Sequence, residues 1–472
     1  MKFRTTLILF AVFVFLVAVV FLLDFMTRGK TEEEEKLIGL SADDVQKITF
    51  KKENGIITFL KDEKGEWLIT VPIEAKADKF EVNRLAEDFS ELRLERVVEE
   101  EPKDLSKYNI PQKEITLWYK DKGEPLKILI GMENPLDGTY FAKRQDEPRV
   151  VLIPSHLKSL MEKKVFDFRQ KDIFKFETDE VRNIRLRTKK KQWEVLKTED
   201  EWQFVQPVKA LAQKSKIDDI LNSLSNLKAK EFISEEKNEE DLKKHKLDIP
   251  EYEITLGMPS ANQEITFFLQ KNEDKVYATT SLSSKIISAE EAILSNLEKE
   301  VDELREKKVA DFYSWQAYRL YLKKEMLELR VLKDEEDKWR FETPEKEAAD
   351  GEKIMKFIRK MEGLEADEFI DPPLSLKDFS LDNPQAEIKI WTKEDDDPEK
   401  IKEIAILVGS EDKEAKKVVV KNAKLDYLFK VDSEFLEELP KEPKDWRIEE
   451  KTEEKKENQD KKNQEKKNKK SK

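Results

Sequence analysis

Three stretches of the chain repeat the same spacing of apolar residues. They cover residues 82–92, 217–227 and 354–364, and in each the apolar side chains stand at i, i+3, i+4, i+7 and i+10. That spacing places them on one face of a helix. Asp78 and Asp350 precede the first and third stretches, where a carboxylate can cap a helix start, whereas Gln213 is a weaker cap before the second. The sequence therefore predicts three related amphipathic helices.

A tryptophan and a proline five residues apart precede each predicted helix. The pairs are Trp67 and Pro72, Trp202 and Pro207, and Trp339 and Pro344, and the tryptophans are 135 and 137 residues apart. A second shared pattern follows each helix and contains Pro111, Pro250 and Pro384, each ahead of a Glu-Ile pair. A fixed internal period of this size indicates three copies of one module.

Short runs with strand character surround each predicted helix. In the first copy they cover residues 48–50, 56–60 and 67–71 before the helix, and 114–119, 127–130, 139–142 and 150–153 after it. Gly55 and Gly65 separate the first runs, and glycine tolerates the positive φ angles of hairpin turns. A second helix is predicted to start near Pro154. Each module is thus predicted as β-hairpin, helix, β-meander and helix, an α+β fold with a mainly antiparallel sheet.

The repeat and its flanks divide the chain into six parts. We expect a transmembrane anchor at 1–30, a linker at 31–39, module 1 at 40–174, module 2 at 175–311, module 3 at 312–447 and a charged tail at 448–472. Modules of this size can each bury a core. The tail is rich in Lys, Glu, Asn and Gln without apolar periodicity, so we expect it to be disordered.

The N-terminal segment is predicted to cross a membrane. Residues 7–23 contain no polar side chain, and the stretch 5–26 reaches the ~20 residues that span a hydrocarbon core. A cleaved secretory signal is the alternative, but Asp24, Phe25 and Met26 do not form the small-x-small pattern of a cleavage site. The expected partner of residues 5–26 is therefore the lipid bilayer. The chain has no cysteine, which excludes anchoring by a lipid-modified cysteine.

The charges that flank this segment do not decide its orientation. Lys2 and Arg4 precede it, and Arg28, Lys30 and Lys36 follow it. Because the short N-terminal stub holds no folded domain, we expect the N-terminus inside and the modules outside the cytoplasmic (inner) membrane. The protein would then be a single-pass protein of the cell envelope, with its modules in the periplasm or outside the cell.

The composition predicts a well-solvated surface. Charged residues make up 41% of the chain, against about 25% in an ordinary soluble protein. The 103 acidic and 89 basic residues are interleaved and sum to a net charge of −14. A nucleic-acid partner is therefore not expected, since its binding would need a basic patch.

Few residues suggest catalysis or metal binding. Of two histidines, His245 shares its repeat position with Tyr108 and Phe379 and is predicted to pack, and His156 lies alone in a predicted helix. The acidic run at 394–397 could form a calcium loop, but it lacks the glycine and the spaced oxygen ligands of such loops, which favours a solvated turn. The sequence also shows no nucleophile, Walker-type or dinucleotide-binding motif. We therefore predict no catalytic residue, no cofactor and no metal site.

One loop is the leading candidate for ligand binding. The stretch 131–140 is rich in glycine and proline in copy one, shorter in copy two and reduced to Gly409 in copy three. Loops on a rigid scaffold often carry function, and the candidate ligand residues are Gly131, Asn134, Asp137, Gly138 and Tyr140. The alternative is an ordinary hairpin loop. The repeated tryptophans could likewise stack on sugars or peptides, but their place beside a helix stripe favours the core.

These features together resemble the DUF4340 family, a domain of unknown function. The resemblance rests on the Trp-x4-Pro pattern, the helix start at Ala77 and Asp78, the Asp-Leu-x-x-Tyr-x-Ile-Pro run at 104–111, the stretch 130–140 and the closing Phe-Arg-x-Lys at 168–171. It covers residues 38–447, and copy one matches best. The resemblance implies a membrane span and a gene position beside ABC transporters of the gliding-motility type. It supplies no catalytic residue.

Two functions follow as hypotheses. The first is a non-enzymatic, membrane-anchored scaffold or auxiliary component of an ABC-type transporter or a similar assembly. The second is a cell-wall polymer binder or hydrolase that uses the loop at 131–140. The shared positions are apolar, aromatic or turn-forming, whereas catalysis needs a few converging polar groups in a pocket. The first hypothesis is therefore favoured.

Overall fold

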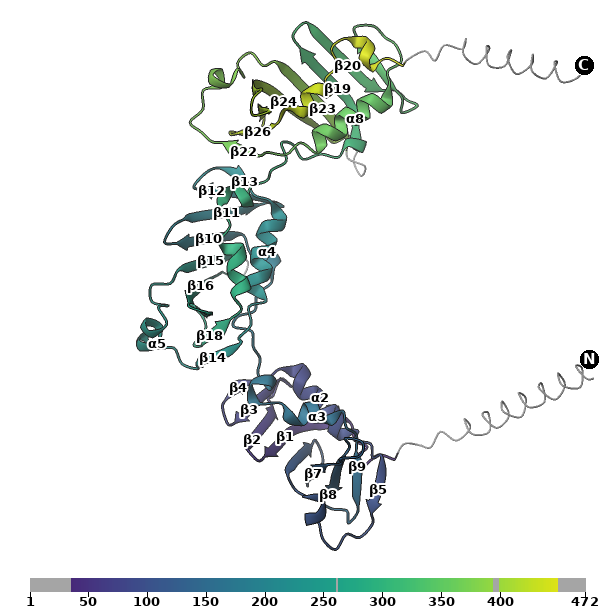
Figure 1. Cartoon of the computed structure of the whole chain (residues 1–472), viewed down its shortest axis with the longest axis vertical. Helices are drawn as coiled ribbons and strands as arrows, with labels where there is room; N and C mark the ends of the chain where they lie inside the picture. Colours follow the sequence, from purple (N-terminus) through teal and green to yellow (C-terminus); the bar gives the residue numbers. More distant parts are fainter. Residues whose placement is uncertain (1–34, 260–261, 394–398, 449–472) are drawn as a thin grey trace, which may run out of the picture. The chain divides into compact units, whose positions relative to one another are not determined.

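The computed structural model describes residues 35–259, 262–393 and 399–448 (Figure 1). The predicted anchor at 5–26, nearly all of the predicted tail and the acidic run at 394–397 lie outside these residues. Among the residues described, no helix is both long enough and apolar enough to cross a membrane. The chain forms two compact units, Met1–Lys171 and Asp172–Lys472. The first unit holds module 1, and the second holds modules 2 and 3.

Module 1 is built on an antiparallel sheet of nine strands in the order β4-β3-β2-β1-β6-β7-β8-β9-β5. The strands are β1 (Val45–Lys52), β2 (Gly55–Lys61), β3 (Trp67–Val71), β4 (Ala75–Lys76), β5 (Arg96–Glu99), β6 (Lys113–Tyr119), β7 (Leu126–Glu133), β8 (Tyr140–Arg144) and β9 (Val150–Ile153). The helices are α2 (Lys79–Ser90) and α3 (Leu157–Glu162), with short 3-10 helices at Ala42–Asp44, Ser106–Tyr108 and Val165–Phe168.

Module 2 repeats this sheet in the order β13-β12-β11-β10-β15-β16-β17-β18-β14. Its strands are β10 (Asn183–Thr188), β11 (Gln192–Thr198), β12 (Glu201–Gln206), β13 (Ala210–Leu211), β14 (Glu231–Ser234), β15 (Tyr252–Met258), β16 (Gln263–Asn272), β17 (Lys275–Thr280) and β18 (Ile286–Ala289). Its helices are α4 (Lys214–Ser225), α5 (Glu239–Lys244), α6 (Leu294–Leu297) and α7 (Val301–Leu304), with 3-10 helices at Thr178–Glu180 and Glu291–Ile293.

Module 3 has eight strands in the order β21-β20-β19-β23-β24-β25-β26-β22. They are β19 (Ala317–Lys324), β20 (Leu327–Lys333), β21 (Trp339–Thr343), β22 (Glu368–Ile370), β23 (Ala386–Lys393), β24 (Ile401–Asp412), β25 (Lys417–Asn422) and β26 (Leu428–Asp432). Its long helix is α8 (Gly351–Glu362), and short 3-10 helices cover Ser314–Gln316, Leu376–Phe379, Ser433–Glu438 and Pro443–Trp446. The threefold antiparallel repeat predicted from the sequence is therefore confirmed.

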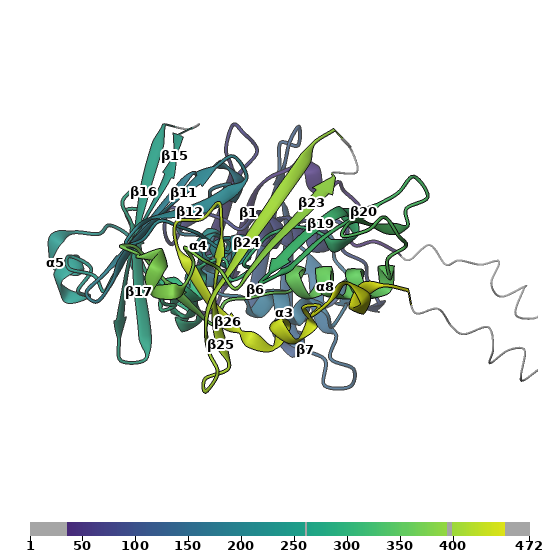
Figure 2. The ribbon, with the colours of Figure 1, turned by 90° about the horizontal axis from the view of Figure 1, so that it is seen from above.

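The long helix of each module carries the chain from one edge of the sheet to the other. In module 1, β4 lies at one edge, and α2 leads to β5, which pairs with β9 at the opposite edge. The predicted hairpin before the helix is a meander of β1, β2 and β3, and the short edge strands β4 and β5 were not predicted. Figure 1 shows α4 along one face of the module 2 sheet, and Figure 2 shows α8 beside the module 3 sheet.

The helices form as their sequence pattern predicts. Every apolar position of the three stripes is at most 6% exposed, so each helix buries one face against its own sheet. The Asp78 carboxylate accepts hydrogen bonds from the backbone N–H groups of Phe80 and Glu81, at 3.0 and 3.3 Å. Asp350 caps α8 in the same way, whereas the Gln213 side chain makes no capping hydrogen bond. The expected difference in cap quality is confirmed.

The repeated tryptophans belong to the three cores. Trp67, Trp202 and Trp339 are 2%, 1% and 5% exposed and lie in β3, β12 and β21. The two-residue strands β4 and β13 separate the first two of these strands from their long helices. Each of the paired prolines follows a cis peptide bond; these are Pro72, Pro207 and Pro344. Pro111 also follows a cis bond. In each module the repeated tryptophan therefore belongs to the core, and the repeated proline sets the direction of the chain after the strand.

Candidate functional site

The polar side chains of the loop at 131–140 bind mainly one another. Asn134 is 4% exposed, and its Nδ2 donates to Asp137 Oδ1 over 2.9 Å. The same Asp137 oxygen accepts from the backbone N–H and the hydroxyl of Thr139, at 3.0 and 2.6 Å. Gly138 supplies the positive φ angle (75°) that closes the turn. Leu136 at the tip is 86% exposed, and Glu133, Pro135 and Asp137 are exposed as well.

Gly131 and Tyr140 hold the ends of this loop in place. A Cβ atom on Gly131 would lie 2.2 Å from the Tyr108 carbonyl oxygen, so the glycine permits a close approach of two backbone segments. The Tyr140 hydroxyl donates to Glu133 Oε2 over 3.0 Å. Burial and this carboxylate raise the pKa of Tyr140 to about 12, so the phenol stays protonated. The five candidate residues therefore lie together, with their polar groups engaged inside the loop.

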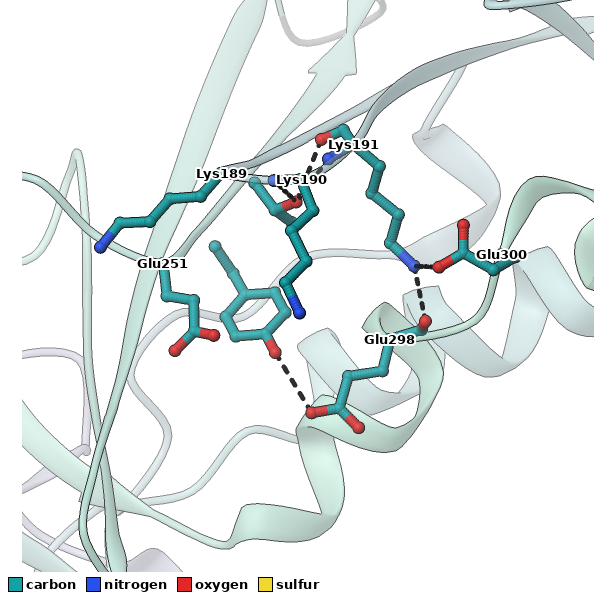
Figure 3. A pocket seen from close by; sticks show the side chains of 8 residues that line it. Lys189, Lys190, Lys191, Glu251, Glu298 and Glu300 are labelled. Atoms are coloured by element: carbon teal, nitrogen blue, oxygen red, sulfur yellow. Dashed lines mark hydrogen bonds and ion pairs between the residues drawn. The ribbon is translucent and has the colours of Figure 1, made fainter.

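A polar cavity of about 370 Å³ lies at one end of the module 2 sheet (Figure 3). Its lining comes from three separate segments: the turn between β10 and β11, the start of β15 and the residues after α6. The lining residues are Thr188, Lys189, Lys190, Lys191, Glu251, Tyr252, Glu298 and Glu300. Three lysines and three glutamates leave it without a dominant charge, so it favours neither a strong anion nor a strong cation.

Contacts across this cavity tie the β10–β11 turn to the chain after α6. Lys191 Nζ donates to the carbonyl oxygens of Glu298 and Lys299, at 2.5 and 2.6 Å, and pairs with Glu300 at 3.3 Å. The Tyr252 hydroxyl donates to Glu298 Oε1 over 3.2 Å. Burial and the charges of the neighbouring glutamates raise the pKa of Tyr252, which keeps this donor protonated. The cavity therefore contains one firmly held lysine and one firmly held tyrosine.

Lys189, Lys190 and Glu251 are the charged groups of this cavity that remain available. Among the described residues neither ammonium group forms an ion pair. Figure 3 shows Lys190 extending toward Glu298, while Lys189 points away beside Glu251. No sequence pattern predicted this cavity, because its lining residues come from three segments spread over positions 188–300 and form no motif. The run of three lysines was the one local signal.

The face of the module 3 sheet opposite α8 carries aromatic rings under cations. We call this set the aromatic–cation face; its residues are Arg319, Tyr321, Arg330, Lys389, Trp391 and Glu403. The strand register joins them in two rows, Arg319–Trp391–Glu403 and Arg330–Tyr321–Lys389. The first row places Trp391 between a basic and an acidic residue, and the second places Tyr321 between two basic residues.

Specific contacts hold both rows. The Arg319 guanidinium carbon lies 5.2 Å from the Trp391 ring centre, and Trp391 Nε1 donates to Glu403 Oε2 over 3.0 Å. Arg330 and Lys389 each lie 5.4 Å from the Tyr321 ring centre. The corresponding register positions of Trp391 hold Trp118 in module 1 and Gly257 in module 2. Module 1 keeps a counterpart of the first row, because Lys47 Nζ lies 4.6 Å from the Trp118 ring centre, but Thr49 and Thr116 stand at the positions of Tyr321 and Lys389. The two rows together therefore occur in module 3.

His245 takes a packing position, whereas His156 is exposed. His245 is 8% exposed, and its ring centre lies 4.4 Å from that of Tyr277. Burial and the nearby Lys244 charge lower the pKa of His245, so the ring is neutral at pH 7. His156 precedes α3. Within the described part of the chain, no cluster of three or more His, Cys, Asp or Glu residues could hold a metal ion.

Comparisons with solved structures return a bacterial sliding clamp at very low similarity. The DNA polymerase sliding clamp from Pseudomonas aeruginosa with ligand is 8% identical, with a TM-score of 0.16, and covers 84% of this chain and 93% of its own. The DNA polymerase III subunit beta from the same bacterium is 7% identical, also with a TM-score of 0.16, and covers 84% and 94%. These values support no argument about fold or function. No curated protein matches the chain.

A family model matches three times, and each match starts at one of the repeated tryptophans. The matches of the "Domain of unknown function (DUF4340)" cover residues 67–237, 202–375 and 339–458. Each begins at Trp67, Trp202 or Trp339, and the first two extend into the following module. The resemblance read from the sequence is confirmed, and the chain belongs to the DUF4340 family.

Proposed function

We propose that this chain is a non-enzymatic, membrane-anchored envelope protein whose modules bind other proteins, with subunits of an ABC-type transporter as the leading partners. The observation that carries the proposal is the aromatic–cation face of module 3. Trp, Tyr and Arg are the residue types that dominate binding energy at protein interfaces. Trp391, Tyr321 and Arg319 lie side by side on one half-exposed sheet face.

A protein partner fits this face better than a polysaccharide does. A sugar ring stacks on a bare aromatic face, but Arg319 already lies over the Trp391 ring. Arg319 and Arg330 pair through Nη2 with Glu342 and Glu328, at 2.9 and 2.8 Å, which leaves part of each donor fork for a partner. A protein surface can supply carboxylates to those donors and apolar side chains to the rings. Arginine suits such contacts because its planar fork binds carboxylates in a bidentate manner. The mixed charges of the face therefore favour a folded protein.

The transporter assignment rests on the family resemblance and on the N-terminal segment. A bilayer anchor at 5–26 would hold the modules close to other membrane proteins and so raise their effective concentration. Membrane location also restricts the partners to proteins that reach the same side of the bilayer. The alternative, a wall-polymer binder or hydrolase using the loop at 131–140, has less support because the loop's polar groups bind one another.

Photo-crosslinking in native membranes tests the binding role. A photoreactive residue at Tyr321 of the full-length chain should capture a membrane-protein partner. The matched control is Arg185, which holds the same register position in module 2 and pairs with Glu194 at 3.3 Å. When the photoreactive residue stands beside Tyr321, Trp391→Ala should lower capture by about tenfold or more, as loss of a hot-spot residue does.

Equal capture from the Tyr321 and Arg185 positions would contradict the role of the aromatic–cation face. Failure to capture any membrane protein, together with turnover of a wall polymer by the purified chain, would replace the proposal with the alternative.

Membrane fractionation tests the anchor. The full-length chain should sediment with membranes and resist carbonate and high-salt extraction, because residues 5–26 would lie in the hydrocarbon core. A chain starting at Thr31 should appear in the soluble fraction. Recovery of a soluble mature chain that begins after Met26 would show instead that the segment is a cleaved signal.

A further inference from the structure

The segment between modules 2 and 3 is hydrogen-bonded on both sides. Toward module 2, the Leu304 carbonyl accepts from Gln213 N–H at 2.8 Å, and Glu306 N–H donates to the Leu211 carbonyl at 2.9 Å. Toward module 3, the Lys307 carbonyl accepts from Ala366 N–H at 2.7 Å, and Val309 N–H donates to the Leu364 carbonyl at 2.9 Å. Residues 304–309 therefore act as a shared strand-like strip and not as a flexible linker.

Arg305 stands in the middle of this strip and is 0% exposed. Its Nη1 and Nη2 donate to the two carboxylate oxygens of Asp371, each at 2.9 Å. Its guanidinium carbon lies 3.8 Å from the Phe369 ring centre and 4.6 Å from that of Tyr427. A buried charge is stable only where it is paired, and the bidentate pair supplies that partner. Asp302 of module 2 adds a longer contact, at 3.3 Å from Arg305 Nη1. Because Asp371, Phe369 and Tyr427 all belong to module 3, the next module supplies the bidentate partner and the aromatic surroundings of this charge.

Apolar residues beside Arg305 complete the same contact. Val208 and Ala210 follow Pro207 at the edge of the module 2 sheet. Ala210 is 6% exposed and belongs to the hydrophobic core cluster of module 3, and Val208 packs against that cluster. Module 2 therefore contributes side chains to the core of module 3, next to the buried ion pair.

Module 3 ends with an equivalent arginine whose surroundings differ. Arg447 bridges Ala349 as Arg305 bridges Ala212, and these alanines each lie five residues after the repeat proline. The positions of Val208 and Ala210 are taken by glutamates: Glu345 and Glu347 follow Pro344 by one and three residues. Arg447 Nη2 pairs with Glu347 at 2.5 Å and lies 3.9 Å from Glu345. Its side chain is 38% exposed, and its charge is balanced within module 3.

We propose that Arg305 is a clasp that fixes module 2 to module 3 at the strip 304–309, and that Glu345 and Glu347 cap the equivalent surface of module 3. In module 2 the residues around Arg305, Val208 and Ala210, are apolar, so this surface is buried only when module 3 follows. In module 3 two carboxylates replace the apolar side chains and satisfy the arginine without a further module. This is the pattern of tandem arrays, whose terminal repeats carry a polar outer face. The inference is independent of the partner-binding role proposed above.

Hydrogen exchange on the full-length chain tests the clasp. Arg305→Met keeps an apolar stem but removes the guanidinium group, which leaves Asp371 without its bidentate partner. We expect the amides of Val309 and Ala366, which bridge strip and module, to exchange about tenfold faster or more, since breaking a buried pair is strongly destabilising. Amides in the centre of module 3, such as those of Ile388 and Val420, should keep their protection.

Arg447→Met is the matched control. It removes the equivalent arginine at the capped end and should leave exchange at Val309 and Ala366 unchanged. If Arg305→Met proves too unstable to study, Asp371→Asn and Arg305→Lys remove the bidentate pair more gently and should accelerate the same two amides. Unchanged exchange at both amides in a folded Arg305→Met chain overturns the clasp. A uniform increase across modules 2 and 3, or an equal effect of Arg447→Met, overturns it as well.

Discussion

Replacing Trp202 with alanine should lower the free energy of unfolding of module 2 by about 3–5 kcal/mol, the usual cost of deleting a buried tryptophan side chain. Trp202 is 1% exposed and packs in a core with Trp193 and Phe204, whose rings lie 6.0 Å apart. Removing the indole leaves a cavity that the surrounding β-sheet and α4 can fill only in part. Urea unfolding followed by circular dichroism measures the change.

Trp315→Ala is the control for this substitution. Trp315 is 53% exposed in module 3, so its loss should change the free energy of unfolding by only about 0.5 kcal/mol, as for most surface substitutions. An unchanged unfolding midpoint for Trp202→Ala, combined with loss of partner capture, would show that Trp202 recognises a ligand or a partner and is not needed for the core.

The repeat itself could be predicted because residues close together in the sequence define it. The helix stripes, the caps at Asp78 and Asp350 and the tryptophan–proline pairs each involve residues fewer than fifteen positions apart. Such patterns reflect local physics: helix periodicity, satisfaction of the first N–H groups and burial of a large ring. The structure places these residues in caps and cores as local chemistry demands.

The edge strands could not be predicted, because distant pairing partners create them. β5 covers only Arg96–Glu99, and its burial pattern shows no fully buried position. It forms a strand because α2 brings the chain to the edge of the sheet, where β5 pairs with β9. A four-residue segment with two charged ends carries no such information by itself.

The residues of the candidate sites could not be predicted either, because their contacts join positions that are distant in the sequence. Arg305 resembles any surface arginine in a chain that is 41% charged, and its partner Asp371 lies 66 residues away. The cavity of module 2 joins three segments, so no local motif marks it. In the aromatic–cation face, cross-strand register brings Arg319 to Trp391, and register is set by the whole sheet. Sequence patterns therefore predicted the scaffold better than its surfaces.

Gly131→Ala should destabilise module 1 by about 1–3 kcal/mol, the usual cost of forcing extra atoms into a packed site. The new Cβ would lie 2.2 Å from the Tyr108 carbonyl oxygen and 2.6 Å from Ile110 Cγ1, so β7 and the 105–110 segment would have to separate. Gly409→Ala should act alike in module 3, where the Phe379 carbonyl oxygen lies 2.3 Å from the added Cβ. Denaturant unfolding of the full-length chain measures both effects.

Gly123→Ala provides the comparison within the same module, because a Cβ at Gly123 would meet no atom within 4 Å. Its unfolding free energy should stay within about 0.5 kcal/mol of the original value. The contrast separates two roles for the loop at 131–140. If Gly131 serves to let two backbone segments touch, only Gly131→Ala lowers stability. If Gly131→Ala leaves the unfolding midpoint in place but abolishes binding of a wall polymer or a protein, the glycine is a ligand-contact residue, and the loop regains its place as the leading candidate site.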